Sequence, residues 1–129
     1  MSKKKKKQRV LFLDDRGKRI MSAVDKWYKY CDLFIVTTAK EAIKQISLKE
    51  WDYISLDYDL NFDEFTPPYL PGNGMEVVRY ICEHAEFFKT ERLLPRIIIH
   101  SANPATASLM VERLREAGFE AIYERWQYD

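Results

Sequence analysis

Cysteine and net charge are both scarce in this chain, and long apolar runs are absent. Its two cysteines, Cys31 and Cys82, lie far apart and match no metal-binding or redox spacing, so we expect buried free thiols in a reducing compartment. The net charge of +1 indicates neither a nucleic-acid partner nor its absence. No apolar run approaches the ~20 residues of a membrane span, and the lysine-rich start lacks the apolar stretch of a signal peptide. These absences predict a cytoplasmic protein that does not enter a membrane.

Charge is unevenly placed along the chain although it nearly cancels overall. Lys3 to Lys7 form an unbroken basic run. We expect residues 1–8 to be a basic flexible tail, because such runs are usually solvated; attraction to a phosphate-rich partner is the alternative. Apolar residues make up 47% of the sequence, as in ordinary globular proteins, so residues 9–129 are predicted to form a single domain with its own core.

Short apolar runs alternate with stretches of helical periodicity. We expect strands at 9–13, 33–37, 53–56, 96–99 and 119–123. We expect helices at 17–30, 38–49, 75–88 and 104–118. Thr38 with Glu41 has the pattern of a helix-capping box. The alternation predicts an α/β fold: a three-layer α/β/α sandwich with a five-stranded parallel sheet in the order 2-1-3-4-5.

The few prolines and glycines concentrate in one segment. Residues 61–74 contain three of the five prolines and two of the four glycines, together with the aromatic residues Phe62, Phe65 and Tyr69. Loops of this length in a compact domain are often lids or binding loops, so we expect a long loop that can stack on a base.

Polar residues follow three of the predicted strands at the point where each strand ends. Asp14 and Asp15 follow the first strand, and Asp57 and Asp59 follow the third. Because strands one and three are neighbours in this order, these carboxylates should meet at one edge of the sheet. Clustered carboxylates repel one another unless a cation is present, and Mg²⁺ prefers oxygen ligands. We therefore predict a site for Mg²⁺, or another divalent cation, on Asp14, Asp15 and Asp57.

The segment after the fourth strand supplies groups suited to phosphate. Ser101 and Asn103, at the entry of a helix, can contact phosphoryl oxygens, and Arg125 after the fifth strand can add a positive charge. His100 can act as an acid or base near neutral pH. The candidate catalytic residues are Asp57, His100 and Asp59.

Each of these residues also has a structural interpretation. Asp15 can cap the first helix, and the two later aspartates can be ordinary loop carboxylates. By strand alternation His100 points away from the face of its two neighbours and can be a hydrogen-bonded structural residue. Ser101 or Asn103 can be a helix cap, and Arg125 can be a surface residue.

The arrangement resembles the receiver domain of response regulators, whose fold is flavodoxin-like. Asp14-Asp15 resembles its metal-binding acidic pair, and Asp57 lies where that family carries its phospho-accepting aspartate. Asp59 falls where the family turns a backbone carbonyl toward Mg²⁺. Ser101-Ala102 resembles its switch pair, and Ala117-Gly118-Phe119 resembles the segment before its fifth strand, which aligns Arg125 with the family's lysine. The resemblance implies that the C-terminal helix is missing or vestigial here.

A variant group, the cyclic-phosphate-processing receiver-like domains, is more similar still. Its His-Ser-Ala-Asn-Pro segment is present as residues 100–104. Its Leu-Asp-His-Asp-Leu strand end appears as residues 56–60 with Tyr58 in place of the histidine. This resemblance implies action on a cyclic phosphate, either a 2′,3′-cyclic end or a cyclic nucleotide.

Three functions follow from these patterns. The first is a metal-dependent cyclic phosphoesterase that binds a phosphate-containing small molecule or an RNA end. The second is a stand-alone receiver phosphorylated on Asp57. The third is a degenerate receiver that acts as a nucleotide- or protein-binding module, with Trp126, Tyr128 and the aromatic loop as apolar contacts.

Overall fold

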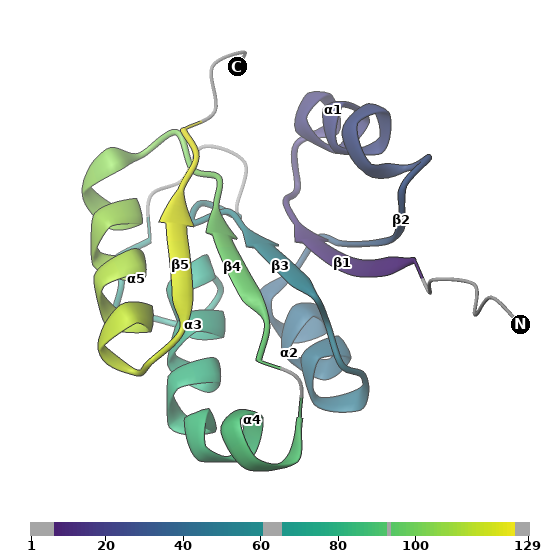
Figure 1. The fold of residues 1–129 in the computed structure, drawn as a ribbon. Coiled ribbons are helices and arrows are strands. Elements are labelled where there is room, and N and C mark those ends of the chain that lie inside the picture. The colour runs from purple at the N-terminus through teal and green to yellow at the C-terminus, as the bar shows by residue number, and fades with distance from the viewer. Residues whose placement is uncertain (1–6, 61–65, 93, 126–129) are drawn as a thin grey trace, which may run out of the picture.

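The computed structural model describes residues 7–60, 66–92 and 94–125. Within these ranges, five parallel strands form one sheet in the order β2-β1-β3-β4-β5 (Figure 1). The strands are β1 (Gln8–Leu13), β2 (Cys31–Val36), β3 (Tyr53–Leu56), β4 (Arg96–Ile99) and β5 (Glu120–Tyr123). The helices are α1 (Gly17–Trp27), α2 (Ala39–Leu48), α3 (Gly74–Glu83), α4 (Ala85–Glu91) and α5 (Pro104–Glu116). The predicted three-layer fold and strand order are confirmed.

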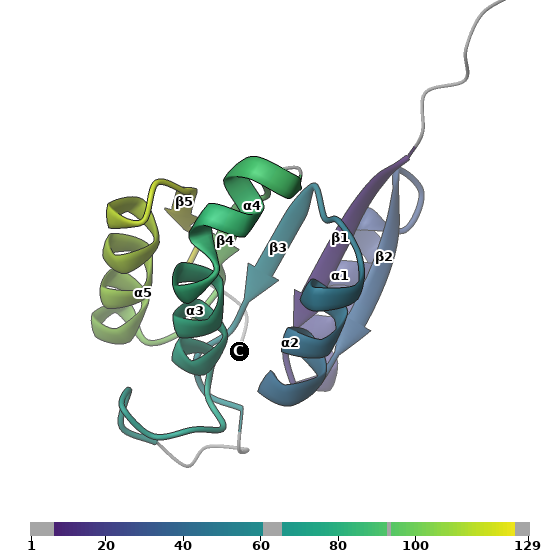
Figure 2. The ribbon, with the colours of Figure 1, turned by 90° about the horizontal axis from the view of Figure 1, so that it is seen from below.

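The two faces of the sheet are covered unequally. Helices α2, α3 and α5 stand in a row on one face, and α1 lies on the other (Figure 2). Alternate residues of β1, β3 and β4 point into the larger core, among them Leu11, Leu13, Ile54, Leu56, Ile97 and Ile99. Each such side chain contributes roughly 1.5–3 kcal/mol by leaving water. Val10, Phe12 and Ile98, on the other face, are also buried, so β1 and β4 read as continuous apolar runs.

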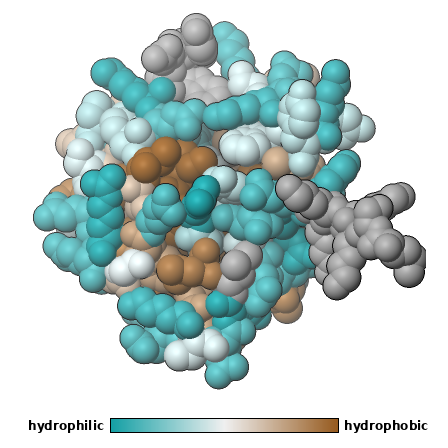
Figure 3. All heavy atoms as spheres, viewed as in Figure 1, coloured by the Kyte–Doolittle hydropathy of each residue, from teal (hydrophilic) through white to brown (hydrophobic). Residues whose placement is uncertain are grey.

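The face that carries α1 is less completely covered. Among the described residues, α1 packs beside β2 and leaves β4 and β5 open to view (Figure 1). Apolar side chains gather in the middle of this face (Figure 3), and Ile122 of β5 is half exposed there. No helix follows β5 in Glu124 and Arg125, the described residues beyond it. Residues 126–129, with the predicted contacts Trp126 and Tyr128, lie outside the described residues.

The helix predicted at 75–88 is wrong as a single element. It divides at His84 into α3 and α4, and α4 continues to Glu91. The His84 backbone leaves the helical region, with φ −107° and ψ 19°, and its Nδ1 lies 2.8 Å from the Tyr80 carbonyl oxygen. A side chain that shares this oxygen with the backbone competes with the helical ladder, and the chain turns there.

Side-chain caps fix where α2, α3 and α5 begin. Thr38 accepts a hydrogen bond from the Glu41 amide at 3.1 Å, as its sequence pattern predicts. Asn73 caps α3 through the Glu76 amide, and Asn103 caps α5 through the Thr106 amide. Such caps contribute about 1 kcal/mol each and hold the strand-to-helix connections in place.

The other predictions about composition and the chain ends have simple outcomes. Both cysteines are free thiols; Cys31 is buried in β2, as expected, whereas Cys82 is only half-buried. Within the described ranges no helix has the length and apolar character needed to cross a bilayer. The predicted tail at residues 1–8 falls mostly outside the described residues, and β1 already begins at Gln8. Phe62 and Phe65 of the predicted long loop also lie outside them, whereas Tyr69 is exposed.

Candidate functional site

Three neighbouring strands bring distant polar residues to one edge of the sheet. Leu13, Leu56 and Ile99 pair across β1, β3 and β4, so the residues that follow them lie side by side. The ladder continues for one residue, because the Asp57 amide donates to the Leu13 carbonyl at 3.1 Å and the His100 amide donates to Leu56 at 2.9 Å. The backbone pairing of the strands therefore fixes the positions from which the side chains of Asp14, Asp57 and His100 extend.

Asp14, Asp15 and Asp57 form a compact group of carboxylates. One oxygen from each lies within 4.8 Å of the others, and Asp14 and Asp57 are buried. Oxygen donors at this spacing suit a hard divalent cation such as Mg²⁺ or Ca²⁺, which also keeps water ligands. The residues present therefore fit the metal predicted from the sequence. Asp15 is not the cap of α1, because the N-cap position is Arg16.

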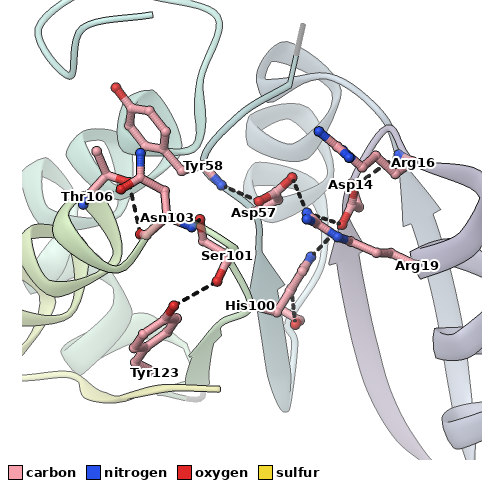
Figure 4. A network of polar contacts seen from close by, with 11 residues as sticks. Asp14, Arg16, Arg19, Asp57, Tyr58, His100, Ser101, Asn103, Thr106 and Tyr123 are labelled. Atoms are coloured by element: carbon pink, nitrogen blue, oxygen red, sulfur yellow. Dashed lines mark hydrogen bonds and ion pairs between the residues drawn. The ribbon is translucent and has the colours of Figure 1, made fainter. Parts of the chain in front are cut away.

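A buried arginine that the sequence analysis did not single out lies between the two buried carboxylates. Arg19 Nη1 is 3.1 Å from Asp57 Oδ2 and 3.5 Å from Asp14 Oδ2, and its side chain is 3% exposed (Figure 4). The apolar positions of α1 predict a buried stripe through Ile20 and Val24, but the fully buried residues of α1 are Arg19 and Ala23. Arg19 and Ala23 share one helix face, one turn apart, but apolar periodicity does not single out a charged residue on that face.

The environment of Asp57 favours its neutral form in the absence of a metal. Burial, and then the negative charge of Asp14, raise the pKa of Asp57 from 3.8 to about 8. Arg19 and the Tyr58 amide, which donates to Asp57 Oδ1 at 2.8 Å, oppose this rise in the pKa. A divalent cation would reverse the balance, because it stabilises the ionised carboxylate.

His100 joins the acidic group from the face that carries α1. Its Nε2 lies 3.1 Å from Asp14 Oδ2 and its Nδ1 lies 2.6 Å from Ser55 Oγ. The ring stacks on Phe12 with centroids 4.3 Å apart. Burial lowers the pKa of His100, an effect that Asp14 opposes. A neutral ring satisfies both contacts when Nε2–H donates to Asp14 and the Ser55 hydroxyl donates to Nδ1.

Behind His100 lies a cavity of about 330 Å³ between α1 and the sheet. Phe12, Ser55 and Ile98 line it from the sheet, and Trp27 lines it from α1. Arg125, predicted to bind phosphate, borders this cavity at the end of β5 and is exposed. Arg125 and His100 thus line the same cavity, on the face of the sheet that carries α1.

The segment after β4 is organised by its own hydrogen bonds. Ser101 is buried, and its Oγ accepts from the Asn103 amide at 3.0 Å. Asn103 Oδ1 caps α5, which confirms the capping alternative for that side chain. The Tyr123 hydroxyl donates to the Ser101 carbonyl at 2.8 Å and ties this segment to β5 (Figure 4). Ser101 and Asn103 thus lie beside the β3 end that carries Asp57.

These residues match a known family model along most of the chain. The model of the cyclic-phosphate processing receiver domain matches residues 9–116. The chain belongs to this family. The match includes the ends of β1, β3 and β4 described above, whereas Arg125 lies beyond it. No curated protein matches the chain.

Solved receiver domains share the fold at low sequence identity. The signal receiver domain of a LuxO repressor protein from Vibrio parahaemolyticus is 20% identical, with a TM-score of 0.67 over 95% of this chain and 81% of that one. The receiver domain of a Francisella response regulator is 21% identical, with a TM-score of 0.62 over 91% and 84% of the two chains. A response regulator from Burkholderia pseudomallei, described with a phosphorylated aspartic acid, calcium ion and citrate, is 14% identical, with a TM-score of 0.63 over 95% and 61%. These likenesses establish the receiver fold.

Tyr58, the departure from the family's strand-end pattern, points away from the acidic group. Its ring lies on the opposite side of the strand end from the Asp57 carboxylate (Figure 4), and its hydroxyl donates to the Thr66 carbonyl. Burial and the charge of Asp59 raise the pKa of Tyr58 to about 12, so it stays a neutral donor. Tyr58 therefore anchors the chain at Thr66, the first described residue after position 65. Asp59 is half-buried and close enough to raise the pKa of Asp57 as well.

Gly74 is a further residue of the site that the sequence analysis did not assign. Its amide donates to the Tyr58 carbonyl at 2.9 Å. A Cβ atom at this position would lie 1.9 Å from the Asp57 carbonyl oxygen, well inside contact distance. Only glycine lets α3 begin this close to the strand end that carries Asp57.

Proposed function

We propose that this domain binds a divalent cation on Asp14, Asp15 and Asp57 and uses it to open a cyclic phosphate. The substrate class is a nucleoside 2′,3′-cyclic phosphate, at an RNA end or as a free cyclic nucleotide. The observation that carries the proposal is the group of three carboxylates, within 4.8 Å of one another, at the ends of β1 and β3. Membership in the cyclic-phosphate processing receiver family supports it.

The cation would supply charge neutralisation of the phosphate and a lowered pKa for water. The chain's own residues hold the phosphate from the other side. In this proposal the Ser101 hydroxyl and the Asn103 side-chain amide donate hydrogen bonds to phosphoryl oxygens. Ser101 Oγ and Asn103 Oδ1 each accept a hydrogen bond from a backbone amide, and these bonds hold the two side chains in position. Arg125 adds a positive charge from the end of β5.

The reaction adds one water to the ring. The water oxygen bonds to phosphorus, and the bond from phosphorus to one ribose oxygen breaks, with its electron pair staying on that oxygen. One water proton ends on the ribose oxygen, and the product is a phosphate monoester. We assign Asp59 to the proton transfer, because its carboxylate lies beside Asp57. His100 is engaged through both ring nitrogens, so we assign it the role of holding the Asp14 carboxylate in place.

A turnover assay tests this proposal. Nucleoside 2′,3′-cyclic phosphates are incubated with the protein and Mg²⁺, and the monoester is followed by phosphorus NMR. We expect Mg²⁺-dependent opening that is lost in Asp57→Asn and on addition of EDTA. Turnover equal to that of Asp57→Asn would reject the enzymatic proposal, and Mg²⁺-dependent binding without turnover would identify a nucleotide-binding module instead.

A second candidate rests on the position of Asp57 itself. It ends β3 next to the buried Asp14, and its side chain can attack phosphorus as a carboxylate nucleophile. One of the structurally similar regulators is described with a phosphorylated aspartic acid. Acetyl phosphate with Mg²⁺ distinguishes the two functions. A phospho-accepting receiver gains the mass of one phosphoryl group, absent in Asp57→Asn, and leaves cyclic phosphates unchanged.

A further inference from the structure

Arg19 contacts carboxylate oxygens that the predicted metal site needs as ligands. We propose that Arg19 is a built-in cation of the acidic group, which a divalent metal displaces, and that Arg19 thereby sets the metal affinity of the domain. This inference rests on the proposed metal site and adds a residue to it. Neither the family match nor the sequence patterns assign a role to this arginine.

The first argument concerns the carboxylate oxygens that are available to bind a metal. Asp14 Oδ1 accepts from the Arg16 amide at 2.9 Å, and Asp57 Oδ1 accepts from the Tyr58 amide at 2.8 Å. These bonds to the adjacent backbone orient both side chains. The other oxygen of each, Oδ2, faces Arg19 Nη1, at 3.5 Å for Asp14 and 3.1 Å for Asp57. Asp14 Oδ2 also contacts His100 Nε2 at 3.1 Å. A metal that binds this pair through Oδ2 meets the guanidinium on the same two atoms.

The second argument is the cost of placing two cations on one pair of oxygens. Like charges that share one pair of oxygens repel strongly at the low effective dielectric of a partly buried site. The Arg19 side chain is 3% exposed, so little water screens this repulsion. Metal entry therefore requires the guanidinium to withdraw from Asp14 and Asp57.

The third argument is what Arg19 does without the metal. Negative charge buried on the Asp14–Asp57 pair would oppose folding without a counter-charge, and a guanidinium that contacts both side chains compensates it. Arg19 thus stabilises the metal-free domain, and the metal replaces it in that role.

The test measures Mg²⁺ and Mn²⁺ affinity by titration calorimetry in the wild type, Arg19→Gln and the matched control Lys18→Gln. Lys18 is the exposed neighbour on α1, so both variants lose one positive charge near the site. We expect Arg19→Gln to bind Mn²⁺ about tenfold more tightly or better, because the competing charge is gone. We expect Lys18→Gln to change the affinity by less than about threefold, because an exposed charge is screened.

Stability measurements give the second readout. The melting temperature of Arg19→Gln should fall without metal and approach that of the wild type at saturating Mn²⁺. Arg19→Lys keeps the positive charge on a shorter side chain, so its metal affinity should lie between those of the wild type and Arg19→Gln. This variant preserves the test if Arg19→Gln does not fold. Folded Arg19 variants with wild-type or weaker metal affinity would overturn the inference while leaving the metal site intact. If neither the wild type nor any of the variants bound metal, both this inference and the proposed metal site would be overturned.

Discussion

Single side chains decide the chemistry of this domain, and Asp57 is the most sensitive of them. In the metal-free fold its pKa is raised to about 8, chiefly by burial and by Asp14. Its unfolded pKa is near 3.8, so folding favours the protonated form. The stability that this group contributes is present below about pH 4 and is lost as the pH rises through about 8.

Metal binding should therefore depend on pH with a definite sign. A metal binds the ionised carboxylate, so Mg²⁺ affinity should rise between pH 6.5 and pH 8.5 and level off above the raised pKa of about 8. Below that pKa, binding should release close to one proton. Calorimetry in two buffers of different ionisation heat measures this proton directly, and release of no proton at pH 6.5 would contradict the raised pKa of Asp57.

His100 supports the site through three contacts, and their loss should be costly. His100→Ala removes the partner of Asp14 and Ser55 and leaves space beside Phe12. We expect a loss of about 2–4 kcal/mol in the free energy of unfolding, measured in urea, because buried polar groups lose their partners and a cavity forms.

The chain offers a matched control for this measurement. His84 is the only other histidine in the sequence, and it is exposed at the junction of α3 and α4. His84→Ala should change the free energy of unfolding by less than about 1 kcal/mol. Equal losses in the two variants would show that the contacts of His100 are not what stabilises the β4 end.

At the scale of elements, the strand ends and the helix starts that follow them set the site. Gly74→Ala would bring Cβ against the Asp57 carbonyl oxygen, whereas a Cβ at Gly17, the first residue of α1, meets nothing within 4 Å. We expect Gly74→Ala to lose roughly 2 kcal/mol or more and to weaken metal binding, and Gly17→Ala to be neutral or slightly stabilising. Urea unfolding and metal titration of both variants check this, and a stable Gly74→Ala variant with wild-type metal affinity would contradict it.

Elements were more predictable from the sequence than the orientation of their side chains. The five strands and their order follow from short apolar runs that alternate with helical periodicity, and the carboxylates at their ends follow from strand order. The division at His84 does not follow from periodicity, because it depends on one histidine that competes for the Tyr80 carbonyl. Arg19 was missed for a related reason: apolar periodicity cannot identify a charged residue that is buried by its ion pairs.

At the scale of the whole molecule, the receiver fold brings separate stretches of the chain to one edge of the sheet. The family match covers residues 9–116 and thus all three strand ends, which is why the resemblance identified the acidic group. Arg125 lies beyond the matched residues and borders the cavity behind His100. One fold can host many unrelated functions, so the function must be argued from the site.

The most direct measurement is a crystal structure of the protein soaked with Mn²⁺ and a nucleoside 2′,3′-cyclic phosphorothioate, with anomalous scattering used to locate the metal. We predict manganese between Asp14, Asp15 and Asp57, the phosphorothioate beside Ser101 and Asn103, and Arg19 withdrawn from both buried carboxylates. A structure in which Arg19 still bridges Asp14 and Asp57 and no anomalous peak lies among the three carboxylates would contradict the metal-dependent site.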